Sequence, residues 1–326
     1  DHFDNYEHWT DEGYEIRQTD GGIKHLTDIT GEKVIDFLDR HSNERSNQPF
    51  CLSVSFNAPH AQDGDPRLYI WPESEEGLYA DATLLEPANA GPAFFESLPL
   101  FIQESESRVR WYARFDTSEN FQRNMKGLYR MVSGIDRNVG RMVETLERHS
   151  LSNNTVIIFA SDHGMYYGER GLSDCWQLNE ESIRIPLIIF DPRRSVNRSV
   201  RDEMVLNIDI VPTILELAGL SIPSIVQGRS LIPFFEDSVD FWRTEFFCEH
   251  RFDTHDRISI PRSEGVRTER WKYIRYDKQN PVYEELYDLG EDPHESHNLV
   301  GDPNYSVRLT EMRHKCADLT QTAGST

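Results

Sequence analysis

The sequence predicts an α/β protein with a largely parallel central sheet and a small C-terminal α+β subdomain that carries an antiparallel sheet. Strand-like and helix-like segments alternate through most of the 326 residues, and such alternation is typical of a parallel sheet covered by helices. After about residue 236 the pattern changes to short strands joined by tight turns. We therefore expect two domains, residues 1–235 and residues 236–326.

Apolar periodicity locates the first elements. Residues 27–40 place their apolar side chains on one face and predict a helix, and the apolar run 49–56 predicts a short strand that ends at His60. Residues 61–118 contain several Pro and Gly, so we expect a long irregular segment near a site. Residues 120–149 carry apolar side chains at three- and four-residue steps and predict the clearest helix of the chain.

The later elements follow from short apolar runs and their boundaries. Residues 155–159 (TVIIF) predict a buried strand, and residues 187–190 predict another strand after Pro186. A helix is expected over residues 208–218, with Gly219 at its end. The C-terminal strands are expected in TEFFCEH, EGVRTERWKYIRYD and YEELYDL, and the final helix near residues 305–316.

Charge and composition exclude several classes of protein. The net charge is −22, from 56 acidic and 34 basic residues, and such a surface repels nucleic acid and anionic membranes. No apolar run is long enough to span a membrane. The first residues are polar and include no initiator Met or signal peptide, which suggests a processed or truncated chain. The four cysteines form no C-x-x-C pair, so thiols and disulfides both remain open.

Two short segments carry side chains suited to chemistry. Asp162 and His163 directly follow the strand over residues 155–159, at the strand end where α/β proteins bind ligands. A carboxylate beside an imidazole suits a divalent metal, although a strand-end Asp can also simply cap the next turn. His60, held after Pro59, could act as a general acid or bind an anionic ester, and an ordinary loop histidine is the alternative.

Six segments in order resemble the type I sulfatases. They are SFNAPH, YRMVSGIDRNVGRMVETLERHSL, NTVIIFASDHGMYYGERGLSDCWQLNEESIRIPLIIFDPR, NIDIVPTILELAG, QGRSLIP and VRTERWKYIRYD with EELYDLGEDPHESHNL. The resemblance covers nearly the whole chain from about His25. It implies an alkaline-phosphatase-like fold and hydrolysis of sulfate esters with a calcium ion, or magnesium in some members.

The resemblance also implies roles for individual residues. Asp162 and His163 match metal ligands of the family, and His60 matches the histidine that contacts the sulfate or protonates the leaving group. His250 could face the substrate from the C-terminal subdomain. The family positions around Arg184, Pro186, His294 and His297 are interpreted as architectural or as surface and turn positions.

Two departures from the family pattern bear on activity. The family nucleophile is a formylglycine made from the Cys of C-x-[PA]-S-R, and none of the four cysteines here lies in that context. We therefore expect the nucleophile in an N-terminal segment that this chain lacks, and the chain alone to be inactive. Cys175 stands where the family commonly has a Lys that binds the sulfate, so a substrate-binding role for this thiol is doubtful.

Three functions remain open from the sequence. The first is a sulfuric ester hydrolase for sugar or aryl sulfates, and the second is a phosphodiesterase or phosphonate hydrolase of the same superfamily. The third is a non-catalytic sulfatase-like binding protein, which Cys175 would suit. The expected partner is a sulfated small molecule or glycan, and the family implies a periplasmic or secreted protein. The substrate and the oligomeric state are not predicted.

Overall fold

The structure is a computed structural model that describes residues 13–45, 47–194, 200–236, 238–239, 241–252 and 259–324. Two compact units emerge from the contacts within the chain. Unit 1 comprises the residues up to Glu86, Arg114–Ile157 and Phe190–Arg193, and unit 2 comprises Pro87–Ala113, Ile158–Ile189 and Arg194–Thr326. Both units are discontinuous in sequence, and the predicted domain boundary at residue 235 stays a prediction.

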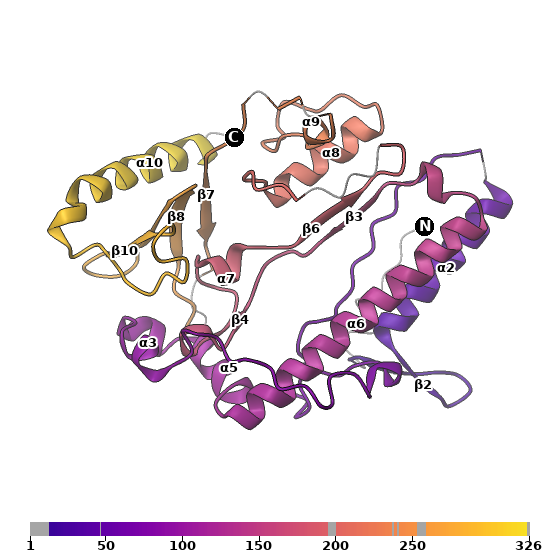
Figure 1. Ribbon diagram of the computed structural model, residues 1–326, viewed down its shortest axis with the longest axis horizontal. Helices are drawn as coiled ribbons and strands as arrows, with labels where there is room; N and C mark the ends of the chain where they lie inside the picture. The colour runs from indigo at the N-terminus through magenta and orange to yellow at the C-terminus, as the bar shows by residue number, and fades with distance from the viewer. Residues whose placement is uncertain are drawn as a thin grey trace. The chain divides into compact units, whose positions relative to one another are not determined.

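Unit 1 is built on two long helices, α2 (Leu26–Glu44) and α6 (Ser118–Arg148), which pack side by side (Figure 1). Both agree with the helices predicted from apolar periodicity. The remaining elements of this unit are short: β1 (Glu15–Arg17), β2 (Ile23–His25), η1 (Glu73–Glu75) and η2 (Ser152–Asn154). β1 and β2 pair in an antiparallel hairpin. Apolar contact between the long helices comes from a cluster around Val34, Leu38 and Leu146.

The strand predicted over residues 49–56 is not formed as a strand. Its side chains alternate between half-buried and exposed positions, as in a strand, and Phe50, Leu52 and Val54 pack against the α2–α6 cluster. However, its backbone forms no ladder within the part of the chain that the structure describes. The prediction of a strand was therefore wrong, because an apolar run marks residues that can be buried but does not supply a pairing partner.

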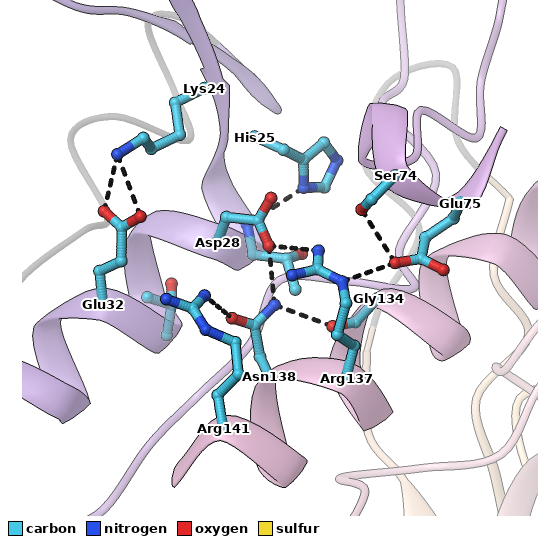
Figure 2. Close-up of polar contacts among 12 residues, drawn as sticks. Lys24, His25, Asp28, Glu32, Ser74, Glu75, Gly134, Arg137, Asn138 and Arg141 are labelled. Atoms are coloured by element: carbon cyan, nitrogen blue, oxygen red, sulfur yellow. Dashed lines mark hydrogen bonds and ion pairs between the residues drawn. The ribbon is translucent and has the colours of Figure 1, made fainter. Parts of the chain in front are cut away.

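A polar network also joins α2 to α6, and Figure 2 shows its members. The Arg137 guanidinium lies 2.6 Å from an Asp28 oxygen and 2.7 Å from a Glu75 oxygen. Asn138 donates to the same Asp28 carboxylate at 2.8 Å. At the start of α2, His25 Nδ1 accepts a hydrogen bond from the Thr27 backbone amide, as a helix N-cap does. The side chains of Arg137, Asp28 and Glu75 are partly removed from water. They therefore need hydrogen-bond partners within the protein, and this network provides them.

Unit 2 contains the C-terminal antiparallel sheet that the sequence predicts. Its strand order is β10-β9-β8-β7, with β7 (Glu245–His250), β8 (Ser263–Thr268), β9 (Trp271–Tyr276) and β10 (Tyr283–Asp288). One face carries Val266, Tyr273 and Leu286, which pack on α10 (Ser306–Gly324) through Met312. The other face packs Ile274, Tyr276 and Tyr287 against residues of the segment that follows β3. Because successive side chains of a strand point to opposite faces, the two faces of this sheet belong to two different apolar clusters.

The strands and short helices around the candidate site lie in unit 2, except for the end residues Arg114, Ile157 and Phe190, which belong to unit 1. β3 (Ile157–Ala160) pairs with β6 (Leu187–Phe190), and β4 (Tyr166–Tyr167) pairs with β5 (Ser173–Asp174). The short helices of this unit are α3 (Pro92–Glu96), α4 (Leu100–Gln103), α5 (Glu106–Arg114), η3 (Glu169–Gly171), α7 (Glu180–Ile183), η4 (Asn207–Asp209), α8 (Ile210–Leu217), α9 (Ile232–Phe235) and η5 (Pro303–Tyr305).

Two predictions about these helices had different outcomes. The predicted helix over residues 208–218 is present as η4 and α8, and Gly219 follows it with φ +70°. The prediction of irregular structure over residues 61–118 was wrong in part, because α3, α4 and α5 lie there. These helices have five, four and nine residues, which is too short for apolar periodicity to identify a helix. No helix among the described residues has the length and apolar character needed to cross a membrane.

Candidate active site

Asp162 and His163 lie in a tight turn directly after β3. The Asp162 side chain accepts a hydrogen bond from the His163 backbone amide at 3.0 Å, and the Ser161 hydroxyl donates to the His163 carbonyl at 3.0 Å. These local bonds replace the ladder bonds that the chain loses when it leaves the strand. The turn leaves the Asp162 carboxylate 86% exposed and the His163 ring 47% exposed. Both side chains are therefore accessible to a ligand.

Gly164 allows this turn to approach α7 closely. Its backbone amide donates to the Ser182 carbonyl at 2.8 Å. A Cβ atom at residue 164 would lie 2.2 Å from the Glu181 carbonyl oxygen and 2.7 Å from that of Arg184. Such distances are far below van der Waals contact, so only glycine fits here. The close approach ties the Asp162–His163 turn to α7.

The structure brings Cys175 to the same place. His163 Nδ1 lies 2.8 Å from the Gly164 carbonyl oxygen, and since a carbonyl only accepts, Nδ1 is the nitrogen that donates. The other ring nitrogen, Nε2, lies 3.6 Å from Cys175 Sγ and 3.6 Å from an Asp162 carboxylate oxygen. Three of the residues predicted from the sequence are thus neighbours. Together they offer a carboxylate, an imidazole and a thiol.

This set of side chains fits a divalent cation only in part. Calcium takes six to eight oxygen ligands and magnesium takes six, whereas Asp162 and His163 offer one carboxylate and one imidazole. Among the described residues, no group of three or more His, Cys, Asp and Glu side chains could hold a metal ion. The pair can therefore serve as two ligands of a site, and the described residues do not complete it.

His60 lies in unit 1, in the turn after the cis peptide bond between Ala58 and Pro59. Its backbone amide bonds the Asn57 carbonyl, and its own carbonyl accepts a hydrogen bond from the buried Tyr14 hydroxyl at 2.8 Å. Its ring Nδ1 lies 2.6 Å from the Ala61 carbonyl oxygen, so this nitrogen donates. These bonds hold the histidine in one orientation. Its catalytic role stays a prediction.

His250 ends β7 in the antiparallel sheet, with its ring 6.2 Å from that of Phe252. Its Nδ1 is buried and has no hydrogen-bond partner within the described part of the chain. Burial lowers the pKa of this imidazole, so at neutral pH the ring carries no charge. A neutral ring could still donate a hydrogen bond to a substrate, and the proposed substrate contact stays a prediction.

A buried ion cluster supports the site, and sequence reasoning did not identify it. Lys272 Nζ on β9 lies 2.6 Å from a Glu180 oxygen and 2.8 Å from a Glu295 oxygen. The other Glu295 oxygen accepts a hydrogen bond from the Glu180 backbone amide at 2.8 Å. Lys272 and Glu295 are 1% and 0% exposed. The only sequence signal was that Glu180 and Glu295 each lie in a family-like motif.

This arrangement defines an α/β protein whose candidate ligand site lies at a strand end. Proteins of this fold class bind ligands at such strand ends. Family models then identify the family. Residues 1–220 match the sulfatase model, and residues 168–322 match the C-terminal model of N-sulphoglucosamine sulphohydrolase. The chain therefore belongs to the sulfatase family, and the resemblance to type I sulfatases is confirmed.

Individual relatives agree with this family. The N-acetylglucosamine-6-O-sulfatase of Bacteroides thetaiotaomicron is 28% identical over 347 residues, covering 88% of this chain and 60% of that protein. A solved structure of a protein in complex with its substrate D-glucosamine-2-N,6-O-disulfate matches with a TM-score of 0.76 and 25% identity, covering 97% of this chain and 72% of that one. The alkaline-phosphatase-like α/β fold is thereby confirmed.

A phosphonate monoester hydrolase of Agrobacterium radiobacter shares the fold, with a TM-score of 0.74 and 24% identity, over 91% of this chain and 60% of that one. At that identity the likeness concerns the fold alone. The chain spans between 50% and 60% of the length of the first curated relatives it matches. The activity of the whole protein is therefore a matter for proposal.

Proposed function

We propose that the whole protein is a hydrolase of sulfate esters and that its substrate is a sulfated sugar. The observation that carries the proposal is the exposed Asp162–His163 pair at the end of β3, in a chain that belongs to the sulfatase family. The choice of a sugar rests on relatives that act on or bind sulfated glucosamine. An aryl sulfate would serve as a convenient assay substrate.

We further propose that Asp162 and His163 are two ligands of a calcium ion, with magnesium as the alternative. An ion bound there would offset the negative charge of the sulfate group. The remaining ligands must come from water or from groups outside the described residues, because the described ones do not complete a site. His60 would donate the proton that the leaving sugar oxygen needs.

The nucleophile in this proposal is a formylglycine supplied by a part of the whole protein other than these 326 residues. Without it, the ester sulfur meets no nucleophile, so the present chain alone should not turn over substrate. The family context also leads us to propose that the protein is exported, to the periplasm or outside the cell.

Two other functions compete with this one. A phosphonate or phosphodiester hydrolase is favoured by the shared fold of the phosphonate monoester hydrolase. A sulfatase-like binding protein without turnover is favoured by Cys175, because the thiol next to His163 brings no fixed positive charge to a sulfate group. Both alternatives predict measurements that differ from those of a sulfatase.

The deciding experiment uses the natural protein. Its intact mass reports whether a formylglycine is present, and turnover of 4-nitrophenyl sulfate is then compared with turnover of a phosphonate monoester, with and without calcium. Calcium-dependent sulfate release that falls at least about a hundredfold in Asp162→Asn would support the proposal. Faster turnover of the phosphonate would favour the second function, and binding of a sulfated sugar without any turnover would favour the third.

A further inference from the structure

Helix α5 is fastened to the segment that carries Cys175. Buried Ser107 exchanges hydrogen bonds with the Gln177 side chain at 3.0 and 3.2 Å. At the next residue, the Arg108 guanidinium donates to the Gly171 carbonyl at 2.9 Å. These contacts lie on both sides of Cys175 along the chain. Side chains of α5 therefore have a defined position relative to the candidate site.

Arg110 on α5 contacts both sequence neighbours of Cys175. Its Nε lies 3.2 Å from an Asp174 carboxylate oxygen, and its guanidinium carbon lies 5.2 Å from the centre of the Trp176 ring. The second distance is within the range of a cation–π contact. Asp174 is buried, whereas Cys175 and Trp176 are half-buried. A fixed positive charge thus contacts the residues directly before and after Cys175 in the chain.

We propose that Arg110 and Trp176 form a subsite that binds a sulfated sugar next to Cys175. The Trp176 ring would pack against the apolar face of the sugar ring, and the Arg110 guanidinium would bind a sulfate group of the same sugar. The naming of a sulfated sugar rests on the proposed function. The contacts that place Arg110 and Trp176 beside Cys175 do not depend on it.

Charge supports this assignment. The chain carries a net charge of −22, so an anionic sugar is repelled over long range and needs a local cation. The guanidinium is planar and weakly hydrated, which suits it to binding oxyanions while it stacks on an aromatic ring. Arg110 also pairs with Glu106 at 3.0 Å, four residues earlier on the helix. Both the Glu106 and the Asp174 carboxylates contact Nε, and a guanidinium has five N–H donors, so it can bind a sulfate oxygen in addition to a carboxylate.

The test measures binding of D-glucosamine-2-N,6-O-disulfate to the 326-residue chain by calorimetry, with N-acetylglucosamine and inorganic sulfate as further probes. We expect Arg110→Gln to weaken binding of the disulfate at least tenfold and Trp176→Leu at least fivefold. Arg110→Lys should recover part of the loss, and Trp176→Phe should recover most of it. N-acetylglucosamine should depend on Trp176 alone, and inorganic sulfate on Arg110 alone.

The chain offers a matched control on α10. Arg308 likewise stacks over a tryptophan, Trp271, at 5.0 Å and pairs with Glu311 at 2.7 Å on its own helix. Arg308→Gln should leave binding of all three probes unchanged. Three results would overturn the subsite. The first is a similar loss of binding in Arg308→Gln, and the second is an unchanged affinity in both Arg110→Gln and Trp176→Leu. The third is no binding to the folded parent chain.

These outcomes are separable from those that test the proposed function. Binding that depends on Arg110 in a natural protein without sulfatase turnover would contradict the proposed function and leave the subsite standing. Turnover of a sulfated sugar with an unchanged KM in Arg110→Gln would support the function and contradict the subsite. Thermal unfolding of each variant reports whether a loss of binding comes from a loss of fold.

Discussion

Replacing Lys272 by methionine should destabilise the chain far more than the loss of one surface charge. Lys272 is buried between Glu180 and Glu295, at 2.6 and 2.8 Å from their oxygens. Glu180 keeps Arg267 at 3.4 Å in the variant, but the fully buried Glu295 loses its closest cation. Removing one partner of a buried ion pair costs about 3–5 kcal/mol, because the charge left behind is neither paired nor hydrated.

The effect should depend on pH in a defined direction. Burial alone would raise the pKa of Glu180, but the Lys272 and Arg267 charges outweigh it and the pKa is lowered. A lowered carboxyl pKa stabilises the fold above the pKa of the unfolded chain, and this contribution is lost as the pH falls. In Lys272→Met the Glu180 carboxyl loses the Lys272 charge that lowers its pKa, so the variant gains stability relative to the parent as the pH falls. The difference between parent and variant should therefore be largest near pH 7.5 and smaller near pH 5.

Urea unfolding followed by circular dichroism at both pH values measures this difference. The control is Lys24→Met, which removes an exposed pair with Glu32 at 2.8 Å and should cost less than about 1 kcal/mol. Lys272→Met/Glu295→Gln should recover much of the stability, since the amide oxygen can still accept the bond from the Glu180 amide. A loss in Lys272→Met no larger than in Lys24→Met, or one that does not change with pH, would refute the reasoning.

Three further predictions concern single residues. Gly164→Ala should destabilise by about 1–3 kcal/mol in urea, because its Cβ would overlap α7, whereas Gly140→Ala, with open space in α6, should stabilise by about 0.5–1 kcal/mol. Burial raises the pKa of Glu285 to about 7, so the folded chain keeps a proton that the unfolded chain has already lost. This proton stabilises the fold in acid, and the stabilisation is lost as the pH rises to about 7. Glu285→Gln should thus stabilise the fold by about 2 kcal/mol more at pH 8 than at pH 5 in urea titrations. Burial also raises the pKa of Cys316 to about 11, and native alkylation at pH 8, mapped by mass spectrometry, should modify it at least about tenfold more slowly than the exposed Cys51.

Long periodic segments were predicted well from the sequence, and unpaired or short ones were not. α6 shows apolar side chains over eight helical turns, so its existence depends little on context. In contrast, the apolar run over residues 49–56 predicted a strand that is not formed, because a strand also requires a partner that no local pattern reveals. α5 has nine residues, and its Glu106–Arg110 pair is too weak a signal to predict a helix by itself.

The residues of the candidate site were likewise predicted only in part from the sequence. Asp162 and His163 were recognised because they follow a strand and match a family motif, and Cys175 because it departs from one. The structure adds the 3.6 Å contact between Cys175 and His163 and the contacts of Arg110 with Asp174 and Trp176, the sequence neighbours of Cys175. Arg110 lies more than 60 residues before Cys175, in a segment where the sequence showed no recognisable motif, so only the fold could bring the two segments together.

The ion cluster joins two sequence motifs that are separated by more than a hundred residues. Glu180 lies in the segment that follows the candidate site, whereas Lys272 and Glu295 lie beyond residue 236, in the predicted C-terminal domain. A cut near residue 235 would separate Glu180 from Lys272 and Arg267, and it would remove the Glu180 amide from the fully buried Glu295 carboxylate. The Glu180 segment also holds Gly164, and through it the Asp162–His163 turn. The C-terminal sheet therefore contributes to the geometry of the strand-end site, and the two predicted domains depend on each other for stability.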